Sequence, residues 1–395
     1  MADAGGRAGA VDSADGMTPS ARKPGAEPQG VAPKPWISEI AAYKGGDAKI
    51  SGHERIVKLS SNENPMGPSP RAVDAFRRAV DKLSIYPDGS ARELREALAG
   101  LHGLDPDRIV CGAGSDELLS LICQTLCGPG DEVVHTEYAF AIYGIAARAM
   151  GATPVVAREK DLTADPDAIL AAVTPRTRVV FLANPNNPTG TYLDRKALTR
   201  LAEGLAPNVL LVIDGAYAEY MRTDDYEAGF ALARRLPNVA VTRTFSKIYG
   251  LASLRLGWMV GPEPLVEAIN KIRGPFNVTG PTLAAGVAAV KDADFVEASA
   301  IQNEVWRDWL VKELRRIGAP TPDSSANFVL PEFGESGPAS AQAVDSFLCS
   351  QGVIVRRMES YNLPGRLRIT VGSPGDNQMV VSALREFFGE LGLLG

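Results

Sequence analysis

The sequence predicts an α/β fold with a large domain built on a mostly parallel sheet, followed by a smaller α+β C-terminal domain. Over the first two-thirds of the chain, apolar segments of strand length alternate with helical segments, as in parallel sheets covered by helices. After about residue 283 the pattern changes to long helical segments separated by short strands. Because 395 residues with 45% hydrophobic content can bury a large core, we expect two packed units.

The individual elements follow from periodicity and from the residues that interrupt it. Apolar residues three and four apart indicate helices, whereas short apolar runs bounded by Gly, Pro, Asn or Asp indicate strands. The predicted helices are residues 71–83, 92–102, 115–126, 165–172, 284–314 and 377–389. The predicted strands are residues 109–110, 132–135, 153–156, 178–183, 209–213, 239–242, 256–260, 326–330, 353–356 and 366–370.

We expect four segments along the chain. Residues 1–34 are rich in Ala, Gly, Pro and Asp and lack the apolar run of a secretory signal, which predicts a disordered tail. Residues 35–58 are expected to form an N-terminal arm. Residues 59–283 are expected to form the large domain, and residues 284–395 the small C-terminal domain.

Composition and charge exclude several classes of protein. The net charge is −6 and no run of Lys and Arg occurs, which argues against nucleic-acid binding. No apolar stretch approaches the roughly 20 residues of a membrane span. Four cysteines and three isolated histidines show no zinc spacing, so we expect no metal and buried, reduced thiols. A few reduced thiols in a long chain fit a cytoplasmic protein.

Polar clusters follow three of the predicted strands directly. These clusters are residues 184–190, 214–217 and 244–247. In open α/β sheets, ligands bind outside the carboxyl ends of the strands. We therefore expect the three clusters to meet in one crevice.

The third cluster and its surroundings suit a ligand with an aldehyde and a phosphate. Lys247 is the residue type that forms a Schiff base with an aldehyde, and Ser246 and Arg255 are good phosphate donors. Ser115 and Asp116 begin a helix after a Gly-rich turn, where free backbone N–H groups favour a phosphate. One aldehyde and one phosphate describe pyridoxal 5′-phosphate. A lone Lys after a strand is usually a surface charge. The phosphate-binding residue types near Lys247 make the cofactor-binding interpretation the better one.

The ring of such a cofactor needs further partners. A buried carboxylate keeps the pyridine nitrogen protonated, and Asp214, at the end of an apolar strand, suits this role as well as that of a helix cap. Asn187 and Tyr217 are hydrogen-bond donors suited to the phenolic oxygen of the cofactor. Such donors lower the basicity of the Schiff-base nitrogen that joins the lysine to the cofactor. The segment 184–190 is equally compatible with a rigid turn.

Four motifs in chain order resemble those of fold-type I pyridoxal-phosphate-dependent transferases, the aspartate-aminotransferase superfamily. They are Asn187-Pro188-Thr189-Gly190, Asp214-Gly215-Ala216-Tyr217, Ser246-Lys247 with Arg255, and Leu367-Arg368-Ile369-Thr370. The resemblance spans the chain from about Pro35 to the C-terminus. Within the superfamily, the segments 60–65, 86–89, 114–117 and 367–372 resemble those of the histidinol-phosphate aminotransferases most closely.

The resemblance implies a role for each matching residue. Lys247, Asp214 and Tyr217 are the implied catalytic residues. The implied cofactor-binding residues are Ser115, Asp116, Phe140, Asn187, Asp214, Tyr217, Thr244, Ser246, Lys247, Arg255 and, reaching the neighbouring subunit of a homodimer, Tyr86. The implied substrate-binding residues are Tyr43, Asn187, Arg356 and Arg368.

The implied reaction is transamination of histidinol phosphate with 2-oxoglutarate to imidazole-acetol phosphate and glutamate, in histidine biosynthesis. Residues 361–364 also resemble aminotransferases that act on phenylalanine or tyrosine, so that activity, alone or beside the first, is an alternative. Two further alternatives are a decarboxylase and a non-catalytic regulator that binds the cofactor. Such regulators usually carry a fused DNA-binding module, and the short N-terminal tail is too poor in apolar residues to form one.

Overall fold

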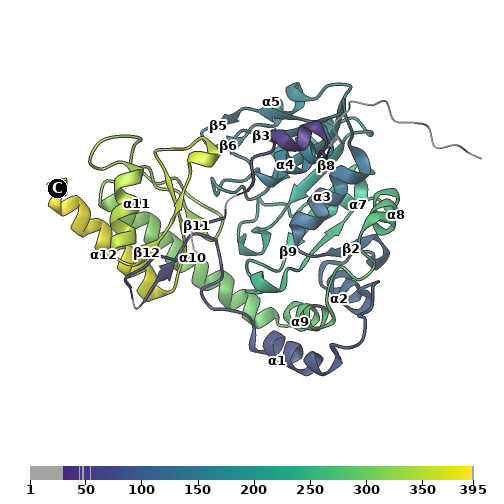
Figure 1. The fold of residues 1–395 in the computed structure, drawn as a ribbon, viewed down its shortest axis with the longest axis horizontal. Helices are drawn as coiled ribbons and strands as arrows, with labels where there is room; N and C mark the ends of the chain where they lie inside the picture. Colours follow the sequence, from purple (N-terminus) through teal and green to yellow (C-terminus); the bar gives the residue numbers. More distant parts are fainter. Residues whose placement is uncertain (1–29, 44, 47–48, 54, 394–395) are drawn as a thin grey trace, which may run out of the picture.

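The computed structural model describes residues 30–43, 45–46, 49–53 and 55–393. Apart from residues 30–34, the predicted N-terminal tail therefore lies outside the described residues. The chain forms two lobes, with the larger lobe on the right of Figure 1 and the smaller lobe, which contains the C-terminus, on the left. The predicted α/β class is confirmed by the seven-stranded sheet of the larger lobe.

The sheet of the larger lobe has the strand order β2-β10-β9-β8-β7-β3-β4. Its strands are β2 (Ile109–Gly112), β3 (Glu132–Thr136), β4 (Thr153–Ala157), β7 (Thr177–Ala183), β8 (Leu210–Asp214), β9 (Val239–Thr244) and β10 (Gly257–Val260). Only β10 runs antiparallel to its neighbours. Each predicted strand of this region is present, so the mostly parallel sheet is confirmed, while the direction of β10 was not predicted.

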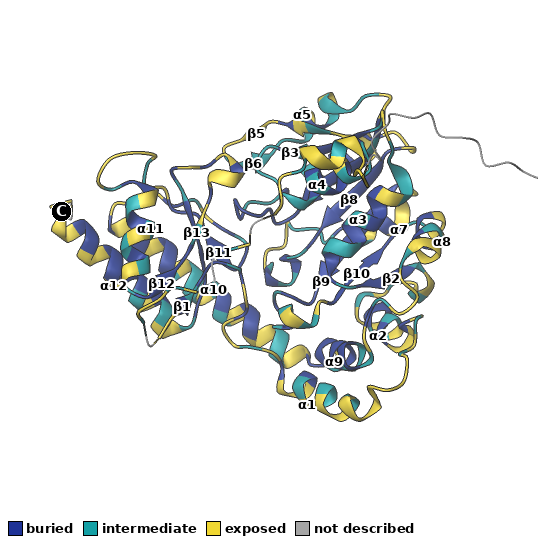
Figure 2. Cartoon of the chain, viewed as in Figure 1, coloured by how far each residue is buried: buried dark blue, intermediate teal, exposed yellow. Residues whose placement is uncertain are grey.

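Helices cover both faces of this sheet, so most of its strands are buried on both sides, while the edge strand β4 is partly exposed (Figure 2). One face packs against α3 (Ser115–Leu126), α4 (Ile142–Ala149) and α8 (Glu263–Ile272). The other face packs against α2 (Arg92–His102), α5 (Pro166–Ala172), α6 (Arg195–Gly204), α7 (Phe230–Arg235) and α9 (Gly280–Val290). Strand side chains alternate between the two cores, as Val179 and Phe181 do against Val180 and Leu182.

The smaller lobe combines short strands with three helices. Strand β1 (Val57–Lys58) pairs with β12 (Val353–Ile354), and a second sheet has the order β11 (Phe328–Val329), β14 (Leu367–Thr370), β13 (Arg356–Arg357). The helices are α10 (Ala293–Arg316), α11 (Ala341–Ser350) and α12 (Pro374–Glu390). The predicted single strand at 353–356 is wrong, because its two ends belong to different sheets. Among the described helices, none is long and apolar enough to cross a membrane.

The predicted continuous helix at 284–314 is also wrong, because the chain breaks between α9 and α10. Asp292 leaves the helical conformation, with φ −101° and ψ 65°. Its buried carboxylate accepts a hydrogen bond from the hydroxyl of Ser69, which itself caps helix α1 (Pro70–Ala79). Helix α9 then packs along α1 in the larger lobe, while α10 continues toward the smaller lobe (Figure 1).

Each lobe has its own apolar core. The core of the smaller lobe joins Val57 and Leu59 to residues from Leu310 onward. Helix α9 and Ala300 belong to the core of the larger lobe. The predicted domain limits at residues 58–59 and 283–284 stay a prediction, and the packing favours a boundary within α10.

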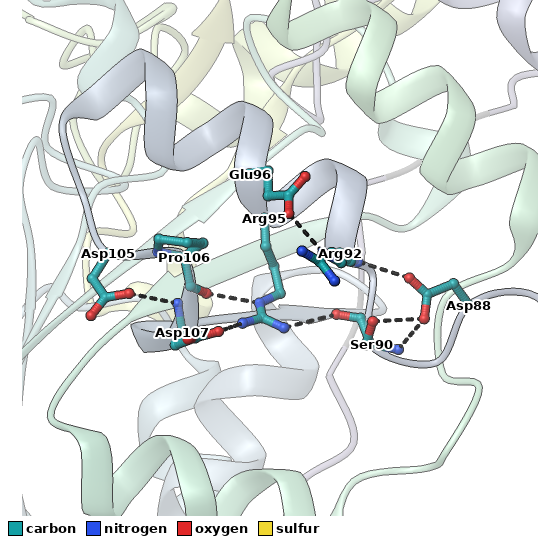
Figure 3. A network of polar contacts seen from close by, with 8 residues as sticks. All are labelled: Asp88, Ser90, Arg92, Arg95, Glu96, Asp105, Pro106 and Asp107. Atoms are coloured by element: carbon teal, nitrogen blue, oxygen red, sulfur yellow. Dashed lines mark hydrogen bonds and ion pairs between the residues drawn. The ribbon is translucent and has the colours of Figure 1, made fainter.

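The turn before α2 is fixed by one aspartate. Asp88 accepts hydrogen bonds from the backbone N–H groups of Ser90, at 2.8 Å, and Arg92, at 2.9 Å (Figure 3). Arg95 of the same helix reaches the Pro106 carbonyl and the Asp107 carboxylate. These contacts connect the turn at residues 86–89 to the start of α2.

Candidate active site

The three predicted polar clusters lie at one edge of the sheet. They follow β7, β8 and β9, which are adjacent and parallel, so their carboxyl ends point the same way. Asn184 and Gly215 donate backbone hydrogen bonds to the carbonyls of Asp214 and Thr242, which ties the first cluster to the second and the second to β9. The predicted crevice is thus formed by neighbouring strand ends.

Lys247 projects into this edge of the sheet with a partly buried side chain. Its Nζ donates to the carbonyl of Ser61 at 3.1 Å and lies 5.8 Å from the ring centroid of Tyr217. Burial, and then the positive charge of Arg368, lower the pKa of the Lys247 amine to about 8. At neutral pH most of this amine is still protonated, but a far larger fraction is in the neutral, nucleophilic form than for an ordinary lysine.

Asp214 ends β8 and is buried. Its Oδ2 accepts from the hydroxyl of Tyr143 at 2.8 Å, and its Oδ1 accepts from the hydroxyl of Thr242 at 3.1 Å. Burial raises the pKa of this carboxyl, and the two hydrogen bonds oppose that rise. Among the described residues no ion pair reaches Asp214, so a cation in the site would stabilise its ionised form.

A phosphate-binding corner is formed where α3 begins. The Nη1 of Arg255 donates to the hydroxyl of Ser246 at 3.1 Å, and its Nη2 lies 3.4 Å from Oδ2 of Asp116. Gly114 precedes the helix with φ 87°, and a Cβ there would lie 2.4 Å from Nη2 of Arg255. Only glycine leaves this room, and the first N–H groups of α3, from Ser115 onward, lack helical acceptors.

Thr244 supports the same corner, and aromatic and amide side chains surround the rest of the crevice. The hydroxyl of Thr244 accepts from the backbone N–H of Ser246 at 3.1 Å. The hydroxyl of Tyr217 accepts from Nδ2 of Asn62 at 2.9 Å, and burial raises the pKa of this phenol, which keeps it neutral. Phe140 meets Tyr143 edge-on, with ring centroids 5.9 Å apart.

The smaller lobe contributes arginines to the site. Arg368 of β14 is buried; its Nη1 donates to Oδ1 of Asn187 at 2.5 Å and its Nη2 to the carbonyl of Ser60 at 2.9 Å. Its Nε has no hydrogen-bond partner among the described residues. Arg356 of β13 lies directly opposite Arg368 in the antiparallel pair. An anion bound between these two guanidinium groups would be attracted by both.

Tyrosines lie beside these arginines. Burial raises the pKa of Tyr361 to about 12, and the positive charges of Arg368 and Arg356 oppose that rise. Tyr43 is about half exposed and meets Phe140 edge-on at 6.3 Å. Of the predicted substrate residues, Arg356 and Arg368 are therefore paired on neighbouring strands, and Tyr43 lies against Phe140.

The structure does not bring Tyr86 into this site. Its side chain is 79% exposed and stacks on Phe276, with ring centroids 4.6 Å apart. Leu83 and Ile85 beside it are also more than two-thirds exposed. The role of Tyr86 at a neighbouring subunit's site stays a prediction.

Four residues of the site were not predicted from the sequence, namely Tyr143, Thr242, Asn62 and Tyr361. Thr242 lies two positions before Thr244 on β9, so the alternation of strand side chains could have indicated it. Asn62 and Tyr361 lie in segments for which the sequence gives only a family resemblance. Nothing in the sequence places Tyr143 beside Asp214, because that contact joins residues 71 positions apart.

The donor set fits a phosphorylated aldehyde attached to a protonatable ring. An amine that is readily neutral, a buried carboxylate without a cation and a corner of phosphate donors meet at one edge of a parallel sheet. With the unpartnered Nε of Arg368 nearby, the site has a second place for an anionic group. These features define the class of pyridoxal-phosphate-dependent transferases.

Comparisons with known proteins narrow this class. The profile of the family described as aminotransferase class I and II matches residues 54–384. Histidinol-phosphate aminotransferases from Ruegeria pomeroyi and Dinoroseobacter shibae are 52% and 51% identical, each over 90% of this chain and over 97% and 98% of their own. A histidinol-phosphate aminotransferase from Sinorhizobium meliloti, solved with pyridoxal-5′-phosphate, aligns with a TM-score of 0.83 at 28% identity, covering 90% of this chain and 97% of that one.

The chain belongs to the class I and II aminotransferase family. Within the family, it groups with the histidinol-phosphate aminotransferases at about half identity over nearly their whole length. The resemblance and the fold type predicted from the sequence are confirmed.

Proposed function

We propose that this protein transfers an amino group between histidinol phosphate and 2-oxoglutarate, giving imidazole-acetol phosphate and glutamate in histidine biosynthesis. The observation that carries the proposal is the pair Arg356 and Arg368, opposed on one sheet face beside the site. A substrate with a phosphate dianion suits two cations, while the carboxylate of glutamate is bound by one guanidinium in a two-pronged way. Relatives of about 50% identity named for this reaction support the same conclusion.

The cofactor is pyridoxal 5′-phosphate, as predicted, in keeping with the family and the relative solved with it. When bound, it supplies an aldehyde that joins amines covalently and a ring that withdraws electrons from the substrate. Lys247 would hold the aldehyde and Asp214 the pyridine nitrogen. The phosphate would be held by Arg255 and Ser246 together with the first N–H groups of α3, which begins at Ser115.

Each residue of the site has a separate role in the proposed reaction. The amine of Lys247 would act as the base and acid that moves a proton to and from the substrate Cα, for which its lowered pKa near 8 suits it. Asp214, ionised beside a protonated ring, would keep the proton on the pyridine nitrogen. Tyr217 and Asn187 would hold the phenolic oxygen. Arg368 and Arg356 would bind and orient the anionic end of the substrate, with the hydroxyl of Tyr43 as a further donor.

We also propose that the enzyme is a cytoplasmic homodimer. The homodimer is supported by the exposed apolar side chains of Leu83, Ile85, Tyr86 and Phe276, which line one hollow of the surface. A second copy of the chain would cover this surface and bring Tyr86 to the phosphate corner of the other site.

Purified protein loaded with pyridoxal phosphate tests the reaction directly. With 2-oxoglutarate as acceptor, histidinol phosphate is expected to give glutamate with a kcat/KM at least about tenfold above that for phenylalanine or tyrosine, since one more charge-assisted contact is worth roughly 1.5–3 kcal/mol. A preference for phenylalanine or tyrosine would favour the aromatic aminotransferase instead. Release of carbon dioxide from phenylalanine or tyrosine, without formation of glutamate, would indicate a decarboxylase.

A further inference from the structure

Three consecutive residues before α1 touch three side chains of the proposed active site. The carbonyl of Ser60 accepts from Arg368, and the carbonyl of Ser61 accepts from Lys247. Asn62 then donates from its Nδ2 to the hydroxyl of Tyr217. Substrate-binding, cofactor-binding and ring-contacting groups are thus joined through one short segment.

The orientation of the Asn62 amide is determined by Thr370. The backbone N–H of Asn62 donates to the hydroxyl of Thr370 at 3.0 Å, so that hydroxyl must turn its own proton elsewhere. It donates the proton to Oδ1 of Asn62 at 3.1 Å. With Oδ1 engaged in this way, the amide can present only its NH₂ group to Tyr217.

This arrangement fixes the direction in which Tyr217 donates. Because its oxygen accepts from Asn62, the phenol cannot give its proton to the same partner. No other hydrogen bond of this hydroxyl occurs among the described residues. The phenol is buried and neutral, so its proton is available for an acceptor in the crevice.

Hydrogen bonds also fix the backbone of Asn62 in an unusual conformation. Its φ is 57°, in the left-handed region that Asn tolerates better than most residues, and its side chain is buried. Its carbonyl accepts from Nδ2 of Asn327 at 3.0 Å. A residue held in this conformation at a functional site is costly unless its surroundings determine it.

We infer that Asn62 is a positioning residue of the reaction, which aims the Tyr217 proton at the phenolic oxygen of the cofactor and is itself oriented by Thr370. Thr370 lies two positions after Arg368 on β14, so both side chains share one face of the strand. The substrate-binding strand therefore also determines the hydrogen bonding of the cofactor ring. This inference rests on the proposed function.

The test replaces Asn62 by an isosteric acceptor. Asn62→Asp turns the donor to Tyr217 into an acceptor, so the phenol gives its proton to residue 62 and withdraws it from the cofactor. A donor at the phenolic oxygen favours the deprotonated form of the bound cofactor. The pH midpoint of the cofactor's absorbance change is therefore expected to rise by about one unit, the equivalent of one such hydrogen bond. Tyr217→Phe should produce a similar rise.

A double-mutant cycle separates this effect from the added charge. If Asn62 acts through Tyr217, Asn62→Asp in the Tyr217→Phe background should move the midpoint by less than about 0.3 units. Additive shifts, or no shift in Asn62→Asp alone, would overturn the inference. Thr370→Val should raise the midpoint and Thr370→Ser should keep it, and equal midpoints for this pair would also overturn it.

The titration does not depend on which substrate the enzyme uses. The protein could bind pyridoxal phosphate and follow the expected double-mutant cycle, yet fail to react with histidinol phosphate. That result would contradict the proposed substrate and leave the role of Asn62 intact. A protein that binds no pyridoxal phosphate would contradict both the proposed function and the role of Asn62.

Discussion

At the scale of single residues, Lys247 is stabilised in its neutral form by the fold. The unfolded chain keeps a proton on this amine up to about pH 10.5, whereas the folded chain without cofactor keeps it only up to about pH 8. Between these values the unfolded state binds more protons, so the stability that Lys247 contributes rises with pH.

Lys247→Met is therefore expected to stabilise the cofactor-free protein at pH 7, and the gain should shrink by about 2–3 kcal/mol as pH rises to 10.5. Chemical unfolding of both proteins across this range gives the comparison, with the exposed Lys196→Met as the control. A difference that stays constant with pH would show that the fold does not disfavour the charged amine.

Arg356 and Arg368 differ in what they are expected to recognise. Arg356→Ala should lower kcat/KM for histidinol phosphate about tenfold or more, while glutamate and phenylalanine are affected less, because only the phosphate needs a second cation. Arg368→Ala should damage every substrate. Arg357, whose side chain is exposed and bonded to Glu359, provides the matched control Arg357→Ala. Equal losses for all substrates in Arg356→Ala would refute a phosphate-specific contact.

At the scale of elements, the break between α9 and α10 depends on a contact with α1. Asp292→Ala removes the acceptor of the Ser69 hydroxyl at a buried position, and is expected to lower the free energy of unfolding by about 1–3 kcal/mol. Combination with Ser69→Ala should cost less than the sum of the two changes. The exposed Asp294→Ala serves as the control, and an equally large loss there would contradict the account.

This break also shows what the sequence leaves open. Helix 92–102 was predicted at its observed limits, because its periodicity and its stop after His102 are local. The interruption at Asp292 depends on Ser69, which is 223 positions away, and no local pattern reports it. In the site, Lys247, Asp214 and Arg255 were predictable from motifs, whereas the contacts of Asp214 with Tyr143 and of Tyr217 with Asn62 arise only in the folded chain.

At the scale of the whole molecule, the apolar surface around Tyr86 lies away from the crevice of its own chain. If two copies cover this surface, each active site needs Tyr86 from one chain and Lys247 from the other. Mixing Lys247→Ala with Tyr86→Ala subunits should then restore partial activity, because a hybrid dimer contains one site with both residues intact.

A matched mixture of Lys247→Ala with Asp214→Ala should restore nothing if both residues serve the site of their own chain. No recovery in the first mixture, despite verified subunit exchange, would argue against a shared site. A monomer in sedimentation would exclude it.

The central claim is that Lys247 carries the cofactor, and borohydride reduction of the loaded enzyme tests it most directly. Reduction makes the bond between the lysine and the cofactor permanent, so peptide mass spectrometry can locate it. We expect the added mass of the reduced cofactor on the peptide that contains Lys247, and its absence from Lys247→Ala. The cofactor on another lysine, or on none, would contradict the account.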